Sequence, residues 1–220
     1  MRKAIGQDQI IAAAFRLLDE AGLEGVSLRK VACMLGIRAP SLYWHFKSKQ
    51  ALVDAMADAL IHQVARDIPP GQHWRVTLLQ IAHEFRHAFK ARRDGARVYA
   101  GTYLATENVM RVGEATIAAL AEAGASVDFA ATTAMDLIYY VLGFVIEEQS
   151  LPINDPAFEQ VSAKFMAMAE ARFPYCWQAR HYLTEPDLER RFEQGVGLLL
   201  DGVQLRLAPP ATSQPEPFAR

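Results

Sequence analysis

Cysteine is scarce in this sequence: only Cys33 and Cys176 occur among 220 residues. The two lie far apart and belong to no Cys-x-x-Cys pair, so we expect reduced thiols in a reducing compartment and no disulfide framework. For Cys33 we expect the role of a small buried side chain, with a redox switch as the alternative.

Long apolar runs are also absent. The longest, residues 137–146, falls well short of the roughly 20 residues that a membrane-spanning helix needs. The first ten residues include two basic side chains, but no apolar segment follows them, so we expect no secretory signal. These two features predict a soluble, cytoplasmic protein with no membrane partner.

The chain as a whole has no strong excess of positive or negative charge, but its two parts do. The net charge is −2 and apolar residues make up 51%, which excludes a uniformly basic coat or a disordered tail. The first fifty residues carry eight basic and four acidic side chains, a net +4, and the remainder carries −6. This asymmetry suggests that only an amino-terminal head meets a polyanion.

Alternating patterns typical of strands are lacking, and almost every segment shows helical periodicity, so the expected fold class is all-α. In the first third we expect a helix ending at Gly22, a second from Ser27 to Gly36, a third beginning around Pro40, and a fourth from Ser48 to about Arg66. The sequence IPPG at 68–71 then marks a domain boundary. Further helices are expected at 73–92, 94–100, 106–123, 127–149, 157–172 and 187–206.

The tight turn at Gly36 between two short helices fits a helix-turn-helix. Leu42 and Phe46 would face its core. The side chains of RAPSLYWHFKSK (38–49) that would be free to face DNA are Arg38, Ser41, Tyr43, Trp44, His45 and Lys49. An aromatic stripe packed into a small core is the alternative for residues 43–45.

Residues 22–56, GLEGVSLRKVACMLGIRAPSLYWHFKSKQALVDAM, closely resemble the DNA-binding head of the tetracycline-repressor (TetR) family, with its specific L-Y-x-H-F-x-x-K-x-x-L core. Segments 92–102 and 142–149 look like the tetracycline-binding branch. The resemblance implies an amino-terminal helix-turn-helix domain (1–48), a linking helix (about 48–66), a helical effector-binding and dimerisation domain (67–207) and a flexible tail (208–220). It also implies a repressor, not an enzyme, that leaves operator DNA when a small molecule binds.

By this resemblance, nine residues would meet the DNA. Ser27, Tyr43, His45 and Lys49 would hold phosphates, and Arg29, Arg38, Pro40, Ser41 and Trp44 would lie at or near base edges. Ala39 stands where tetracycline repressors carry a base-reading amide, which puts their operator sequence in doubt for this chain.

The effector pocket is expected inside the helical body. The candidates, by pattern and by resemblance, are Phe85, Phe89, Tyr99, Tyr103, Tyr139, Phe144 and Glu147. Tyr99 and Tyr139 stand where the resemblance would place histidines, and Tyr103 replaces an arginine. Because a neutral phenol is a poor partner for assembling Mg²⁺, we expect a flat or aromatic effector and not Mg–tetracycline. For each aromatic, a plain core role is the alternative.

Two segments favour a homodimer. Residues 137–146 are apolar on every side, and residues 191–207 repeat Phe192, Val196, Leu199 and Val203, with Gly195 allowing close approach. Two such helices from each subunit would make a four-helix interface. The paired heads would then read a palindrome with half-sites about 34–36 Å apart.

One motif points elsewhere. HEFRH (83–87) has the spacing with which a helix offers two imidazoles to zinc and a carboxylate to its water. No third ligand follows at the short spacing that some zinc proteases use. We therefore expect no catalytic residue, no metal site and no cofactor. A zinc-dependent hydrolase and a DNA-bound activator without effector are the alternatives.

Overall fold

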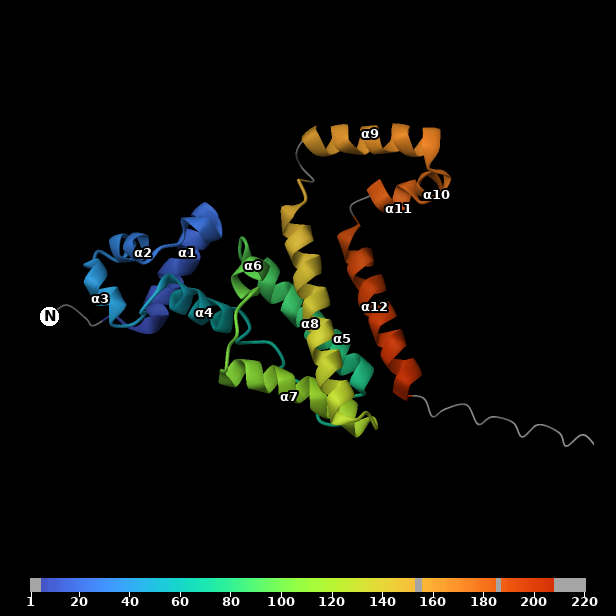
Figure 1. Ribbon diagram of the computed structural model, residues 1–220. Helices are drawn as coiled ribbons and strands as arrows, with labels where there is room; N and C mark the ends of the chain where they lie inside the picture. Colours follow the sequence, from blue (N-terminus) through green and yellow to red (C-terminus); the bar gives the residue numbers. More distant parts are fainter. Residues whose placement is uncertain (1–4, 153–155, 185–186, 208–220) are drawn as a thin grey trace, which may run out of the picture.

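The computed structural model describes residues 5–152, 156–184 and 187–207, and within them every regular element is a helix (Figure 1). The expected all-α class is therefore confirmed. The expected tail, 208–220, lies outside the described residues. The helices are α1 Gln7–Gly25, α2 Leu28–Met34, α3 Ala39–Tyr43, α4 Lys49–Leu60, α5 Trp74–Lys90, α6 Gly95–Tyr99, α7 Glu107–Glu122, α8 Val127–Ser150, α9 Pro156–Arg172, α10 Pro174–Gln178, α11 Arg180–Thr184 and α12 Leu188–Leu207.

The head is built from α1 to α4 around one apolar core, which includes the fully buried Leu18, Leu42 and Leu52. Ser27 caps α2 by accepting a hydrogen bond from the Lys30 amide at 3.3 Å, and Ser48 caps α4 by accepting one from the Ala51 amide at 3.1 Å. Each cap satisfies an amide that the first turn of a helix leaves without a partner.

Cys33 is exposed, so the expected buried role is wrong. The side chains of α2 that face the core are those of Val31 and Ala32, and position 33 falls on the outer face. The expected stop at Gly22 is also only partial. Gly22 has φ +70 and interrupts α1, but a further helical turn continues to Gly25.

The fourth helix ends at Leu60, where we expected it to run to about Arg66. Residues 61–65 form irregular turns, and Ala65 has a positive φ of 55°. The guanidinium of Arg111 donates to the carbonyls of Ile61 and Val64, the groups that a longer helix would use internally. A residue distant in sequence therefore sets this helix end.

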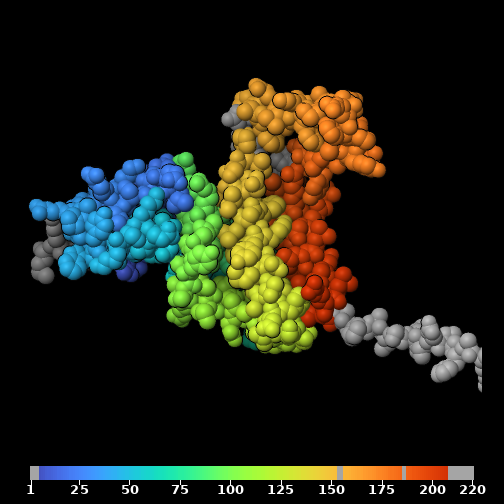
Figure 2. All heavy atoms as spheres, in the orientation of Figure 1, coloured from blue at the N-terminus to red at the C-terminus, as the bar shows by residue number. Residues whose placement is uncertain are grey.

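The body packs α5, α7, α8 and α12 around a second apolar core. Leu78, Phe89, Leu120, Leu137 and Phe192 are nearly or fully buried there. The helix α9 and the short helices α10 and α11 form an arm beside the ends of α8 and α12, remote from the head (Figures 1 and 2). The head is thus one lobe at the far end of an elongated molecule (Figure 2).

Among the described residues, α8 is one helix long and apolar enough to pass a length-and-composition test for a membrane span. The short run 137–146 did not reveal this, because Asp136 ends the run and a second uncharged stretch, residues 129–135, lies beyond it. Core helices of soluble proteins pass the same test. In α8, Leu137, Val141 and Val145 are packed into the body core.

Candidate DNA-binding and effector sites

The predicted DNA face is open to solvent. Of its nine residues, eight are exposed and Ser27 is half-buried. Trp44 is 82% exposed, an unusual position for so large an aromatic side chain unless it serves contact. Leu42 and Phe46 are buried beneath this face, so the structure excludes packing of residues 43–45 into the head core.

Two lysines shape the face further. The Nζ of Lys47 lies 5.6 Å from the ring centroid of Trp44, a cation–π contact that keeps a positive charge beside the exposed indole. Our sequence reasoning passed over Lys47, although its spacing of three from Trp44 signals the contact. The Nζ of Lys49 donates to the Leu23 carbonyl at 3.3 Å, which ties the start of α4 to the end of α1.

The body contains a cavity of about 360 Å³ among α5, α6, α7, α8 and residues 101–104. Four predicted effector residues line it, namely Phe85, Tyr99, Tyr103 and Tyr139. Burial, and secondarily the negative charge of Asp58, raises the pKa of Tyr99, so its phenol stays a neutral hydrogen-bonding group. The cavity can therefore enclose an apolar molecule and offer it a few hydroxyl groups.

The structure does not bring the other three predicted residues into this cavity. Phe89 is fully buried behind its wall, 5.6 Å from Phe85 and 5.3 Å from Tyr99 between ring centroids. Phe144 faces α12, with its ring centroid 5.2 Å from that of Phe192, and Glu147 is exposed on α8. We therefore leave these three out of the proposed pocket.

Sequence reasoning also missed part of the cavity wall. Met135, Ile138 and Leu142 line it together with Tyr139, at the 3–4 residue spacing of one helix face. That spacing was visible in the sequence, but a helix apolar all round hides which face meets a cavity. Other lining residues are Ile81, Gly101, Thr102, Leu104, Val109, Val112, Gly113, Thr116, Ala134 and Leu137.

The start of α7, the helix that forms one cavity wall, also holds the end of α4. Asp58 of α4 accepts hydrogen bonds from the Thr106 hydroxyl at 2.5 Å and from the Asn108 amide at 2.9 Å. Hydrogen bonds to a carboxylate are about twice as strong as neutral ones. A shift of α7 against the cavity would thus be transmitted to the head.

The helix α6 makes a second connection. Val98 is fully buried in the head core, and its neighbour Tyr99 lines the cavity. Just before α6, the Asp94 carboxylate accepts a hydrogen bond from the Leu23 amide at 2.9 Å, and Arg92 pairs with Asp19 at 2.7 Å. The cavity and the head are therefore joined through one short helix as well as through α7.

Both histidines of HEFRH line one groove, together with Asp67 and Glu84. The Nε2 of His83 lies 2.9 Å from a carboxylate oxygen of Glu193 on α12, whereas the exposed His87 lies outside the group of ligand atoms that His83 forms with Glu189 and Glu193. Glu84, the would-be catalytic carboxylate, accepts the Ala65 amide at 2.6 Å. The spacing of a protease motif is present here without its geometry.

On α12 the buried stripe is Phe192, Val196, Leu200 and Val203. We expected Phe192, Val196, Leu199 and Val203 to face a second subunit, but Phe192, Val196 and Val203 are buried in the core of their own chain and Leu199 is half-buried. A Cβ added at Gly195 would lie 2.0 Å from the Tyr140 hydroxyl, so the close approach at this glycine is to α8 of the same chain. The outer face of α12 exposes Leu198 and Leu205.

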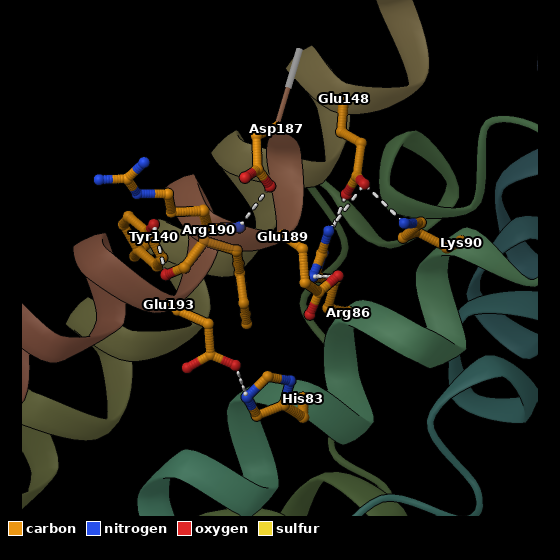
Figure 3. Close-up of polar contacts among 10 residues, drawn as sticks. His83, Arg86, Lys90, Tyr140, Glu148, Asp187, Glu189, Arg190 and Glu193 are labelled. Carbon is orange, nitrogen blue, oxygen red and sulfur yellow. Dashed lines mark hydrogen bonds and ion pairs between the residues drawn. The ribbon is translucent and has the colours of Figure 1, made fainter. Parts of the chain in front are cut away.

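A buried ion cluster, also missed, joins α5, α8 and α12 (Figure 3). Arg86 is 5% exposed and donates to both carboxylate oxygens of Glu148, at 3.0 and 2.9 Å, and to Glu189 at 2.7 Å. Lys90 donates to Glu148 at 2.6 Å. Burial alone would raise the pKa of Glu148, but the hydrogen bonds from Arg86 and Lys90 outweigh it and hold that pKa below its ordinary value.

Comparisons with known proteins agree with this arrangement. Residues 10–56 match the family described as bacterial regulatory proteins, tetR family, and residues 69–207 match the tetracyclin repressor-like C-terminal domain. The class A tetracycline repressor from transposon 1721 of Escherichia coli is 36% identical over 90% of this chain and 89% of its own.

Two solved structures from Streptomyces coelicolor are similar as well. A possible TetR family transcriptional regulator shares 29% identity at a TM-score of 0.81, over 91% of this chain and all of its own. ActR in complex with actinorhodin shares 26% identity at a TM-score of 0.85, over 96% of this chain and all of its own.

Proposed function

Because the chain belongs to the tetracycline-repressor (TetR) family, we propose that it is a ligand-responsive transcriptional repressor, which binds a palindromic DNA operator as a homodimer and leaves it when a small molecule enters the cavity. Within the head, we assign the helix-turn-helix domain to residues 1–48 and the linking helix to α4, and we assign the effector-binding and dimerisation body to residues 67–207. The protein acts in the cytoplasm, where the operator is, and its role is that of a regulator and not of an enzyme.

The observation that carries the proposal is the double contact of α6 and α7. Both helices line the cavity, and both hold the head, through Val98 and through the bonds to Asp58. A molecule that displaces the cavity wall therefore tilts α4 and moves each recognition helix out of its groove. An effector that binds the DNA-incompetent state 100-fold more tightly shifts this equilibrium by about 2.7 kcal/mol.

At the DNA, the exposed surface of residues 38–49 enters the major groove. Tyr43, His45 and Lys49, with Ser27 beside them, hold phosphates and fix the register. Arg38 lies at the amino-terminal end of α3, where a guanidinium can address guanine in a bidentate manner. Arg29, Pro40, Ser41 and Trp44 complete the surface at or near base edges.

The effector class follows from the cavity lining. Among the described residues that line it, the polar side chains are hydroxyls of tyrosine and threonine, and neither carboxylate nor imidazole is present. Hard cations such as Mg²⁺ require charged or carbonyl oxygens. A flat, aromatic or apolar molecule therefore suits this cavity better than a Mg–tetracycline chelate, although relatives named tetracycline repressors share the fold.

The homodimer is argued from the outer face of α12. Leu198 is 74% and Leu205 78% exposed in the single chain. Large apolar side chains in such positions favour burial against the same surface of a second copy. Pairing also supplies two recognition helices, since one covers too little of an operator.

The test begins with selection of bound DNA from a random duplex pool, followed by binding measurements over a range of salt. Lys49→Ala should weaken binding and reduce the salt slope by about one for each head, because one phosphate contact is lost. Tyr43→Phe should weaken binding without changing the slope. The control is Lys164→Ala, which removes the same charge from an exposed position on α9.

If Lys49→Ala and Lys164→Ala give the same affinity and slope, the assignment of the DNA face is wrong. A thermal-shift screen of small molecules against the full chain, with release of the selected DNA as the readout, then tests the cavity. An activator that needs no effector would yield no compound that releases the DNA.

A further inference from the structure

His83, Glu189 and Glu193 bring three metal-ligating groups together between α5 and α12 (Figure 3). The Nε2 of His83 lies 2.9 Å from a Glu193 oxygen, and the ligand atoms of all three residues lie within 4.8 Å of one another. We propose that these side chains bind a divalent transition-metal ion, with Zn²⁺ as the best fit, and that the ion fastens α12 to α5.

The imidazole of His83 is held in position for this role. Its ring packs edge-on against Phe192, with centroids 5.3 Å apart, and Phe192 is itself fully buried. Glu189 and Glu193 are four residues apart on α12, so their side chains share one face of that helix. One fixed imidazole and two carboxylates on a single helix face form a partly pre-assembled ligand set.

The distances suit a small divalent ion after a modest adjustment. With bonds of about 2.0–2.2 Å, two ligand atoms of a tetrahedral zinc are about 3.4 Å apart. The pair of His83 and Glu193 is slightly closer than this, at 2.9 Å. Glu189 has a side chain 67% exposed and can turn toward the ion at little cost. Since the site opens to solvent, water completes the coordination.

Charge also favours a cation here. Arg86 pairs with Glu148 and Glu189, Lys90 pairs with Glu148, and Glu193 pairs with the imidazole of His83, so three carboxylates and two cationic side chains take part in these contacts. When Glu189 turns toward a metal, Arg86 keeps both of its bonds to Glu148. The buried guanidinium is therefore not left without a counter-ion, which would be the main cost of the rearrangement.

The ligand chemistry selects the metal class. Imidazole nitrogen suits Zn²⁺, Ni²⁺ and Cu²⁺, whereas Mg²⁺ prefers oxygen ligands in octahedral geometry. None of the three residues lines the body cavity, so this site is separate from the proposed effector pocket. Its expected effect is structural, because it would stabilise the seating of one of the two helices that we expect to form the dimer.

The test uses the untagged full-length chain after dialysis against a chelator. Titration with ZnCl2 in a calorimeter should show one ion bound per chain. Thermal unfolding should shift upward by about 5 °C at a zinc concentration near 100 times the dissociation constant, and MgCl2 should give no shift. His83→Gln and Glu193→Gln should each weaken zinc binding at least about 10-fold.

The matched control is His87→Ala, which removes the other histidine of HEFRH and lies outside the cluster. This variant should bind zinc as the unchanged protein does. The proposal is overturned if zinc neither binds nor shifts unfolding, or if His83→Gln and Glu193→Gln bind zinc as tightly as the His87 variant. DNA binding by the metal-free protein plays no part in these outcomes, so they are independent of the proposed repressor function.

Discussion

Arg86→Met gives the most demanding test of the ion cluster. Methionine can follow the aliphatic part of the arginine, but it removes the bidentate bonds to Glu148 and the bond to Glu189. Glu148 has a side chain only 7% exposed and would keep Lys90 as its single cationic partner. The variant therefore leaves a buried carboxylate with one of its two cationic partners removed.

The expected loss is large because the pair is buried. Removal of one partner from a buried ion pair costs about 3–5 kcal/mol, whereas replacement of both by apolar groups is close to neutral. Arg86→Met should thus lower the free energy of unfolding by about 3 kcal/mol or more, and Arg86→Met with Glu148→Leu should recover most of that loss. Lys90→Met removes a 42% exposed partner and should cost at most about 1 kcal/mol.

The assay is urea unfolding of the unchanged protein and the three variants, followed by circular dichroism at one fixed protein concentration, since dimer formation makes apparent stability depend on concentration. The order of stability carries the reasoning. If Arg86→Met falls within about 1 kcal/mol of the unchanged protein, or if the double variant is the least stable of the set, the cluster does not stabilise the body as described.

Three further outcomes are expected. The folded-state pKa of Glu148 is lowered, so its contribution to stability is complete above the ordinary value of 4.5 and is lost as the pH falls through the lowered value. Glu148→Gln should therefore make the free energy of unfolding depend less on pH in the acid range. An unchanged dependence on pH would contradict this. Gly113→Leu places a side chain where a Cβ meets nothing within 4 Å, so it should stabilise α7 by about 0.5–1 kcal/mol while blocking the cavity; operator binding that still responds to the effector would argue against this pocket. Gly195→Ala brings a Cβ to 2.0 Å from the Tyr140 hydroxyl and should destabilise the chain by about 1–3 kcal/mol, measured by thermal unfolding against Gly197→Ala, where space is open.

The sequence predicted most helices and the exposure of residues 43–45 because those depend on local signals. Caps such as Ser27 and Ser48, and the pairing of Leu42 with Phe46, act within a few residues of one another. The end of α4 could not be predicted in this way, because it is set by Arg111, some fifty residues further along the chain.

The lining of the body cavity was predicted only in part for the same physical reason. Tyr99 and Tyr139 come to line one cavity only after α6 and α8 have packed, and Phe144 faces α12 through a rotation that an all-apolar helix pattern does not specify. The Arg86 cluster joins three helices that are remote in sequence, and none of its members carries a local motif.

The position of Val98 limits where this chain can be divided into independently folding fragments. This valine follows the IPPG break by more than twenty-five residues, yet it fills the core of the amino-terminal lobe. A fragment that ends at the IPPG break would lack Val98 and leave its place in the core open to water. A chimaera that joins the residues before the break to the body of another protein would have the same cavity. Exchange of operator specificity between such proteins should therefore carry α6 along with the reading head.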